Sequence, residues 1–350
     1  CYSKSRWSQT YYNGMKNPWD INKEDFPYSG QLTDKIKFVL GYAILAPSTH
    51  NSQPWLFKVK ENSVEVYYDS KLKLPEADPL GRDLYISMGC LLENLTIAAN
   101  YFGIFEKLEY ILNDNLVAEV FFQDDGQLNN DLEYLLDTIP KRVNARGFFE
   151  SKSLPESVQE EMRALKKDPR IRVDIITDKE RINKLASLTA QGLRLAYKRP
   201  TFRKEMYQWM FNSLSRTRRG LPGYSLRMPF IASFIIPTLV KFFDISPLLA
   251  KLNYKSMASV PFICVLSSEE SSPSVWLEVG RLAERCILQL NSEGIKTSIF
   301  VASIEMGDLY KKVQELIGSN LTPQFLFCAG YMQNTQRHSP RYNLGEKIII

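Results

Sequence analysis

Two helical segments of the sequence match each other without a gap, and they constrain the fold more than any other feature. GCLLENLTIAANYFGI, residues 89–104, aligns with GRLAERCILQLNSEGI, residues 280–295, at a constant offset of 191 residues. Six of the sixteen aligned positions are identical, including a glycine near each end. Amphipathic helices that end at a glycine resemble one another in any case, but the order of the elements around both segments is also the same. The sequence therefore predicts an internal duplication.

Helix-period and strand-period segments alternate through both halves of the chain. In the first half the pattern predicts helices over 32–45 and 84–102, with strands over 56–60, 64–68, 108–112 and 118–122. In the second half it predicts helices over 154–166, 178–197, 276–292 and 306–317, with strands at RVDII, PFICVLS and QFLFCAG. We expect an α+β fold of two pseudo-symmetric halves in one chain, 31–138 and 139–350, after an N-terminal extension over 1–30.

The second half carries a long segment that has no counterpart in the first. It separates the helix that ends near Tyr197 from the strand at Pro261, and we place the insertion at about 198–258. Insertions of this length in compact domains are commonly lids or binding elements. Its most apolar part, residues 228–243, is shorter than the about 20 residues that a membrane-spanning helix needs. We expect this part to be buried or to form a lid.

Charge and cysteine use argue against two classes of function. The net charge of +5 is spread among 39 acidic residues, and no basic run is longer than 216–219, so nucleic-acid binding is not expected. Only two histidines and no CxxC spacing argue against a metal site. Cys90, Cys264, Cys286 and Cys328 lie in apolar patterns and are expected to be buried free thiols.

The sequence begins at Cys1, which leaves two interpretations open. A terminal cysteine before a polar, aromatic-rich stretch is what remains after a bacterial lipoprotein signal peptide is removed. Acylation of that cysteine would anchor the protein to a membrane, and this would be its only attachment. Alternatively, the first residue reflects only where the sequence was cut, and the protein is cytoplasmic.

Two polar motifs stand at the starts of the halves, and each half lacks the motif of the other. APSTHNSQPW, residues 46–55, puts Ser48, Asn51 and Gln53 on one helix-to-strand connection, although a turn needs only one or two such residues. KRVNAR, residues 141–146, precedes the first predicted helix of the second half. Amide side chains both donate and accept hydrogen bonds, and arginines offer charge-assisted donors to phosphate. A plain polar loop and solvated surface charges are the alternatives.

The first motif resembles the flavin-binding loop of the nitroreductase family. RVNARGF resembles that family's Arg-x-Ser-x-Arg-x-Phe phosphate motif, with Asn144 in place of the serine. In ordinary members the two motifs come from different subunits of a homodimer, whereas here they lie in two halves of one chain. This division is similar to the Acg-type branch, in which a dimer is fused into one polypeptide with a lid in its second half. Further matching blocks are LPEADPLGRDLYISMG, RRGLPG, WLEVGRLAERCIL, GIKTSIFVASIE and PQFLFCAGY.

The resemblance implies a nitroreductase-like fold with FMN as the cofactor. One complete flavin site can be assembled, so one FMN per chain is expected, in a monomer that mimics a dimer. The resemblance implies no metal ligand and no catalytic side chain, because the flavin carries the chemistry. For Arg341 a solvated surface position is the alternative, and His50 is expected to be a packing or loop residue. The implied FMN-binding residues are Pro47, Ser48, Asn51, Gln53, Arg142, Asn144, Arg146, Thr297, Ser298 and Arg341.

The resemblance leaves two functions open. The first is an oxidoreductase in which FMN takes two electrons from a reductant such as NAD(P)H and passes them to a small electron-poor acceptor, a nitroaromatic or a quinone. The second is a catalytically silent protein that sequesters FMN beneath the lid. The bulky side chains expected to cover the ring in that case are Tyr207, Trp209, Met210 and Phe211.

Overall fold

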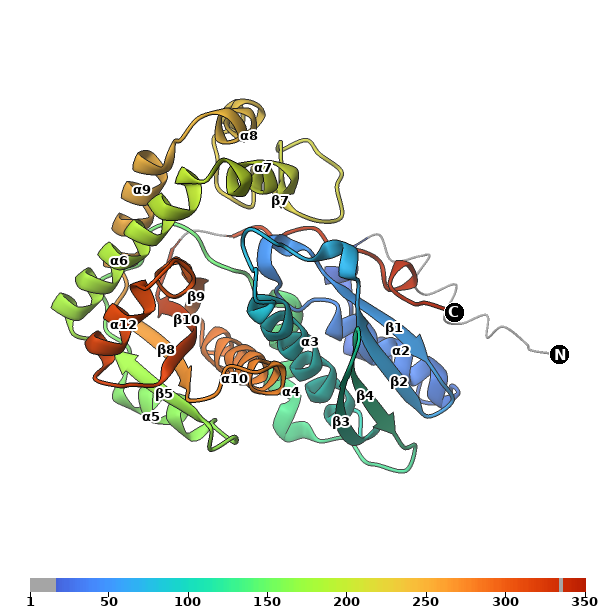
Figure 1. The fold of residues 1–350 in the computed structure, drawn as a ribbon. Helices are drawn as coiled ribbons and strands as arrows, with labels where there is room; N and C mark the ends of the chain where they lie inside the picture. The colour runs from blue at the N-terminus through green and yellow to red at the C-terminus, as the bar shows by residue number, and fades with distance from the viewer. Residues whose placement is uncertain (1–16, 334–335) are drawn as a thin grey trace.

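The computed structural model describes residues 17–333 and 336–350. Cys1, which carries the lipid anchor in one of the two interpretations, lies outside these residues. The chain has the predicted mixed α+β architecture, with two four-stranded antiparallel sheets on either side of a central pair of helices (Figure 1). Cys90, Cys264, Cys286 and Cys328 are buried free thiols, as predicted.

The first sheet has the strand order β1-β2-β4-β3, and every neighbouring pair is antiparallel. The inward-facing residues of β1 and β2 alternate with more exposed ones, as expected for strands with one buried face. The strands are β1 Trp55–Val59, β2 Ser63–Tyr68, β3 Phe105–Asn113 and β4 Leu116–Phe122, and the helices are α2 Leu32–Ala43, α3 Arg82–Tyr101 and the short α4 Glu133–Thr138.

The second sheet has the strand order β5-β8-β10-β9, again with antiparallel neighbours only. When β5, β8, β9 and β10 are matched in chain order with β1, β2, β3 and β4, the two sheets have the same strand order. An internal duplication would produce this agreement. The strands are β5 Ile171–Ile176, β8 Phe262–Ser268, β9 Lys296–Ile299 and β10 Thr322–Gly330, and the helices beside them are α5 Glu156–Ala164 and α10 Pro273–Ser292.

Helices α3 and α10 cross at two glycines that the sequence alignment pairs with each other. A Cβ atom on Gly89 would lie 2.2 Å from the carbonyl oxygen of Leu277, and one on Gly280 would lie 2.1 Å from that of Ile86. The offset of 191 residues that relates the glycines also relates Ile86 to Leu277. Reciprocal contacts of this kind are what a two-fold axis generates. Only glycine permits so close an approach of the two backbones.

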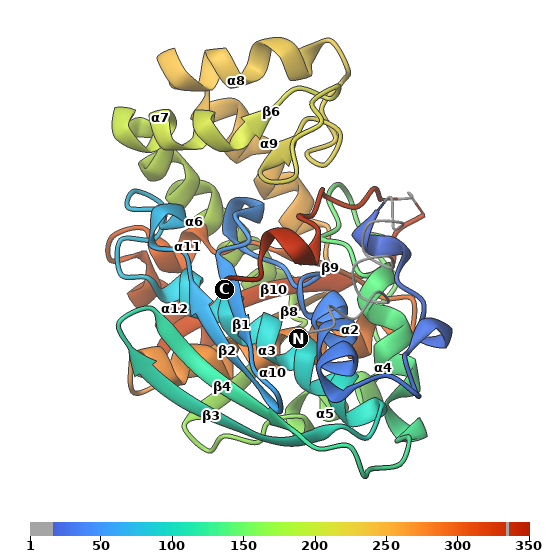
Figure 2. The ribbon, with the colours of Figure 1, turned by 90° about the vertical axis from the view of Figure 1, so that its right-hand side faces the viewer.

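Further elements interrupt the second half. The strands β9 and β10 are separated by α11 Ala302–Glu305 and α12 Leu309–Ile317, where the first half has a tight hairpin. Between β5 and β8 lie α6 Lys179–Lys198, α7 Pro200–Trp209, α8 Ala232–Phe242 and α9 Ser246–Ala258, with the two-residue strands β6 Met210–Phe211 and β7 Leu221–Pro222. Figures 1 and 2 show α7, α8 and the loops between them projecting beyond the two sheets.

The sequence predicts that residues 228–243 are buried or form a lid. In the structure only one face of this segment is buried. In α8 the side chains of Ser233, Pro237 and Val240 are buried, whereas Ile235 remains 52% exposed. Among the described residues no single helix is long and apolar enough to cross a membrane. Helices α8 and α9 pass that test only as a pair, across a bend of 118°.

Two segments outside the named strands each lie against an edge strand of a sheet. Asn144 forms a parallel bridge with Thr297 of β9, and near the C-terminus Ile348 forms one with Phe57 of β1. The second bridge is held by hydrogen bonds of 2.8 Å from Phe57 N to the carbonyl oxygen of Lys347 and from Ile349 N to that of Phe57. KRVNAR and the C-terminal segment, which contains Arg337 and Arg341, thereby lie beside the loop at 46–55.

Candidate functional site

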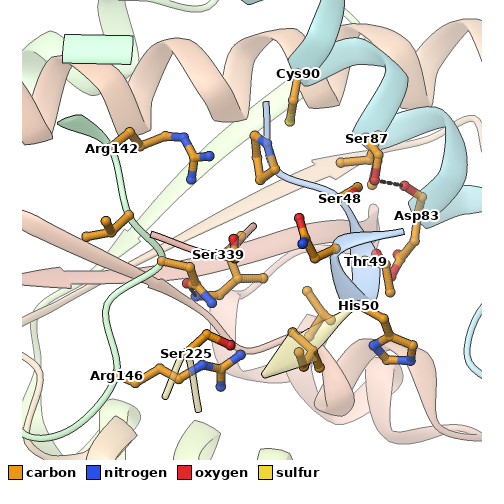
Figure 3. A pocket seen from close by; sticks show the side chains of 18 of the residues that line it. Ser48, Thr49, His50, Asp83, Ser87, Cys90, Arg142, Arg146, Ser225 and Ser339 are labelled. Atoms are coloured by element: carbon orange, nitrogen blue, oxygen red, sulfur yellow. Dashed lines mark hydrogen bonds between the residues drawn. The ribbon is translucent and has the colours of Figure 1, made fainter. Parts of the chain in front are cut away.

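A cavity of about 260 Å³ lies where three segments distant in sequence meet. They are the loop at 47–51, the strand-like segment at 142–146 and the C-terminal segment at 337–341. Figure 3 shows Arg142 and Arg146 on one side of the cavity, opposite Asp83 on α3. The volume is near the lower end of the about 300 to 1,000 Å³ typical of ligand pockets.

The loop at 46–55 has a strained backbone. His50, Asn51 and Gln53 have φ values of 53°, 54° and 51°, in the left-handed region. Such a conformation costs about 1 to 2 kcal/mol for a residue with a side chain, and it persists only where the surroundings hold it. Part of the support comes from the Ser48 hydroxyl, which accepts a hydrogen bond of 2.9 Å from the backbone N–H of Gln53. The amide residues of the loop are therefore placed by a rigid connection.

Gln53 lies outside the cavity and serves the structure around it. Its side chain is fully buried. The amide Nε2 donates to the carbonyl oxygen of Arg218 at 2.8 Å, and Oε1 accepts from the backbone N–H of Tyr342 at 2.9 Å. Gln53 therefore joins the loop to the insertion and to the C-terminal segment. Gln53 is not among the residues that line the cavity, and FMN binding by this amide stays a prediction.

Asn51 lines the cavity, and its amide is also engaged by the protein. Nδ2 donates to the carbonyl oxygens of Gly220 at 3.1 Å and Pro340 at 2.9 Å, while Oδ1 accepts from Nη1 of Arg341 at 2.5 Å. Gly220 belongs to the RRGLPG block of the insertion. The insertion is therefore tied directly to the loop that forms one wall of the cavity.

Arg341 is buried, so the alternative of a solvated position is wrong. Its Nη2 donates to the carbonyl oxygens of Leu45 and Ala46 at 3.1 and 3.0 Å, and Nη1 donates to that of Pro340 and to Asn51. Burial lowers the pKa of this guanidinium. Because its donors are largely used by carbonyl oxygens, Arg341 mainly stabilises the wall of the cavity.

Arg142 forms a buried ion pair that the sequence did not reveal. Its Nε lies 3.2 Å from Oε1 of Glu284 on α10, and Nη2 donates to the carbonyl oxygen of Leu45 at 2.9 Å. Glu284 is fully buried, and burial raises the pKa of its carboxyl to about 7 against the opposing influence of Arg142. The sequence signal that could have identified Glu284 is its alignment with Glu93. Glu93 likewise forms ion pairs with arginines, Arg281 and Arg285.

Arg146 is a cavity-lining cation without a partner carboxylate. Within the described ranges no Asp or Glu oxygen lies within 4.0 Å of its guanidinium, and burial lowers its pKa. Its backbone is fixed, because the carbonyl oxygen accepts a hydrogen bond of 2.7 Å from Arg227 and the N–H donates to Gln336 at 3.2 Å. The side chain of Arg146 is partly exposed, and a cation with no carboxylate beside it attracts negatively charged groups. The site therefore favours an anionic ligand next to Arg146.

Asn144, Thr297 and Ser298 form the support behind this segment. Asn144 lines the cavity while its Oδ1 accepts from the backbone N–H of Ile299 at 3.0 Å. Thr297 accepts from the Ala145 N–H at its carbonyl oxygen and from Asn291 at its hydroxyl. Thr297 and Ser298 are buried and do not line the cavity, whose β9 contribution is Ile299.

Arg337 is a fourth cavity-lining arginine, and nothing in the sequence singled it out. Its guanidinium carbon lies 4.3 Å from the ring centre of Tyr224, in the insertion. Stacking of this kind leaves the N–H edge of a guanidinium available for an anion. Arg337 therefore extends the basic side of the cavity toward the insertion.

The opposite wall is acidic. Asp83 accepts a hydrogen bond of 3.1 Å from the hydroxyl of Thr49. Burial and the nearby Asp83 carboxylate raise the pKa of Glu305, which also lines the cavity. His50, expected to be a loop residue, lies at this wall as well. The cavity is thus basic at one side and holds carboxyl groups at the other.

The chain is similar to proteins of known designation over most of its length, although no protein-family model matches it. "Putative NAD(P)H nitroreductase acg" from Mycobacterium tuberculosis is 24% identical over 314 residues, which cover 88% of this chain and 92% of that protein. The chain is therefore similar to Acg along nearly the whole length of both proteins. A second M. tuberculosis protein of the same designation is 36% identical over 70 residues, 20% of each chain.

The chain also overlaps a solved structure in part. That structure is the FMN-dependent nitroreductase NfnB from Mycobacterium smegmatis in complex with NADPH. The TM-score is 0.42 at 15% identity, with 63% of this chain and 99% of that chain covered.

Both histidines of the chain are expected to stay neutral well below pH 6. Burial lowers the pKa of His50 and of His338 from 6.5 to about 4. The unfolded chain binds these protons below pH 6.5, whereas the folded chain does not. The free energy of unfolding should therefore fall as the pH drops from about 6.5 to 4. Because the chain has only two histidines, NMR titration of their imidazole signals measures both, and midpoints near 6.5 would contradict the expectation.

Proposed function

We propose that this chain binds FMN in the cavity and acts as a flavin-dependent oxidoreductase. The observation that carries the proposal is the meeting of the two polar motifs at one cavity, with the Arg146 guanidinium unpaired by any described carboxylate. FMN ends in a phosphate dianion, which is the kind of group that such a cation binds. Among the described residues, Nε2 of His50 is buried without a hydrogen-bond partner. The donor set fits an anionic ligand that also carries polar ring edges.

The cavity residues divide into two groups in this proposal. Arg146, with Arg142 and Arg337 nearby, would hold the phosphate at the basic side. Pro47, Ser48, Asn51 and the neighbouring backbone would border the ring. When bound, FMN would supply two-electron transfer, and the protein would supply binding, orientation and electrostatics.

The reductant and acceptor are proposed by analogy. Acg carries the designation of an NAD(P)H nitroreductase, which supports NAD(P)H as the reductant and a small electron-poor compound, a nitroaromatic or a quinone, as the acceptor. The matching sheets and the reciprocal glycine contacts support our further proposal that the chain is a fused dimer equivalent with one flavin between its halves.

A second candidate function, sequestration of FMN, is favoured by the way the insertion is fastened. Its segment at 218–220 is held to the loop by three hydrogen bonds, from Gln53 to Arg218, from Asn51 to Gly220, and from Gly220 N to the carbonyl oxygen of Asn51 at 3.1 Å. Leu221 and Ser225 then line the cavity. We propose that the insertion is a lid, closed by these contacts. The bulky residues at 207 and 209–211 are not among those that line the cavity.

The substitution Gln53→Ala, which should loosen the lid, distinguishes the oxidoreductase from the sequestering protein. This change removes the bond to the insertion and the one to Tyr342, so opening should become easier by about tenfold or more. In stopped-flow measurements of the FMN-loaded chain, NADPH should reduce the flavin slowly in the intact protein and about tenfold faster in the variant. Gln314→Ala is the matched control, because Gln314 also donates to two backbone carbonyls, far from the cavity on α12.

The outcomes are distinguishable. No reduction by NADPH in either protein, with normal reduction by dithionite, would overturn the oxidoreductase proposal and favour sequestration. Fast reduction of the intact chain, unchanged in Gln53→Ala, would contradict the lid.

A further inference from the structure

The insertion carries an apolar stripe on the outer side of α8. Ile231, just before the helix, and Phe234, Ile235 and Phe242 within it are 74%, 46%, 52% and 62% exposed. Their spacing of three, four and eleven residues from the first places them on one face of a helix. Large apolar side chains that gather on one exposed surface mark an interaction site more often than single ones do.

The inner side of α8 already has its packing partner. Val240 and Pro237 are buried, and Val240 belongs to a small apolar core that also contains Phe202, Met206 and Trp209 of α7. The outer stripe is therefore not needed to hold the helix in place. Among the described residues nothing covers it, and Figures 1 and 2 show α8 at the outer end of the molecule, remote from both sheets.

The charge of the insertion differs sharply from that of the rest of the chain. Residues 198–258 contain eleven Lys and Arg but only two acidic residues, Glu205 and Asp244. The remaining residues contain 33 basic and 37 acidic side chains. A chain that is mildly acidic elsewhere therefore carries its excess of positive charge in the insertion that also bears the apolar stripe. Anionic surfaces attract such a segment.

Lysines stand next to the apolar side chains in a way that suits an interface between water and lipid. The Lys241 ammonium lies 4.6 Å from the ring centre of Tyr207 and 5.1 Å from that of Phe242. On α9 the exposed side chains of Leu248, Lys251, Leu252 and Lys255 follow helical spacing, so that leucine and lysine share one face. Long lysine side chains can cover apolar surface while the charge reaches the polar layer.

We propose that the insertion docks onto an anionic membrane surface through the outer stripe of α8. The stripe lies on the outer side of a single helix and combines aromatic and aliphatic side chains with basic neighbours. Helices that lie in a lipid interface have the same composition. At 11 residues α8 is too short to span a bilayer, so the chain would lie on the surface. The proposal rests on neither the flavin site nor acylation of Cys1.

The test is vesicle flotation of the full chain produced without lipid modification. Vesicles of phosphatidylcholine mixed with phosphatidylglycerol should carry the protein upward, and vesicles of phosphatidylcholine alone should carry much less. Added salt should weaken the binding, because attraction between surface charges is screened. Absence of binding to the anionic vesicles would overturn the proposal.

Surface variants locate the binding. The triple change Phe234→Ser, Ile235→Ser and Phe242→Ser should reduce the partition coefficient by at least about tenfold, and Lys251→Glu with Lys255→Glu by about fivefold or more per charge. Matched controls are Leu80→Ser, 76% exposed outside the insertion, and Lys312→Glu with Lys167→Glu, which should bind like the parent.

Three results would contradict the assignment. The first is binding that the α8 changes leave intact, because the contact would then lie elsewhere. The second is binding lost equally in the controls. The third is a dimer in sedimentation that the triple change dissociates, with no vesicle binding by the parent, because the stripe would then join two copies of the chain.

Discussion

Replacement of Arg146 by alanine is expected to weaken FMN binding by about ten- to a hundredfold. A charge-assisted hydrogen bond is worth roughly 1.5 to 3 kcal/mol, and each 1.4 kcal/mol corresponds to about tenfold in affinity. Arg146 should show the largest loss of the cavity arginines, because Arg142 is already paired with Glu284 and Arg341 is held by backbone carbonyls. Isothermal titration of the flavin-free chain measures the change.

Riboflavin provides the internal control for this prediction, since it lacks the phosphate. Its affinity should be the same in Arg146→Ala and in the parent. Arg163→Ala, at an exposed position on α5, should affect neither ligand. Equal losses for FMN and riboflavin would mean that Arg146 does not face the phosphate.

Replacement of Gly280 by alanine should lower the free energy of unfolding by about 3 kcal/mol. Overpacked side chains cost about 1 to 3 kcal/mol, and more where neighbours cannot move. Here the new Cβ would meet the carbonyl oxygen of Ile86 at 2.1 Å, and that atom belongs to the backbone of α3. Helices α3 and α10 would have to separate. Urea unfolding monitored by circular dichroism measures the loss.

The reciprocal geometry makes this prediction more specific. Gly89→Ala should cost about as much as Gly280→Ala, because its Cβ would meet the carbonyl oxygen of Leu277 at 2.2 Å. Gly345→Ala is the control, since nothing lies within 4 Å of its Cβ position. A loss below about 1 kcal/mol at either helical glycine would show that the crossing adapts easily.

The long periodic elements could be predicted from sequence, whereas the helices inside the insertion could not. The two long helices α3 and α10 and most of the strands lie within a few residues of their expected positions, because each has a clear apolar period. Strand β9, Lys296–Ile299, was missed because four residues carry too little pattern. Helix α8 was missed because its outer side is apolar and Pro237 stands inside it.

The residues that line the cavity agree only in part with the predicted FMN-binding residues. Pro47, Ser48, Asn51, Arg142, Asn144, Arg146 and Arg341 all line it, although FMN binding by these residues stays a prediction. Gln53, Thr297 and Ser298 do not line it. An amide of a given sequence can serve a ligand or a neighbouring backbone, and only tertiary contacts decide between the two. For Gln53 the contacts are with Arg218 and Tyr342, both far away in sequence.

The central claim is that one FMN binds where the two polar motifs meet, and a crystal structure of the FMN-loaded chain tests it most directly. The account predicts one flavin per chain, with its phosphate within hydrogen-bonding distance of Arg146 and its ring beside Pro47, Ser48 and Asn51. A phosphate bound away from Arg146, two flavins per chain, or a chain that takes up no flavin when soaked at saturating FMN would contradict it.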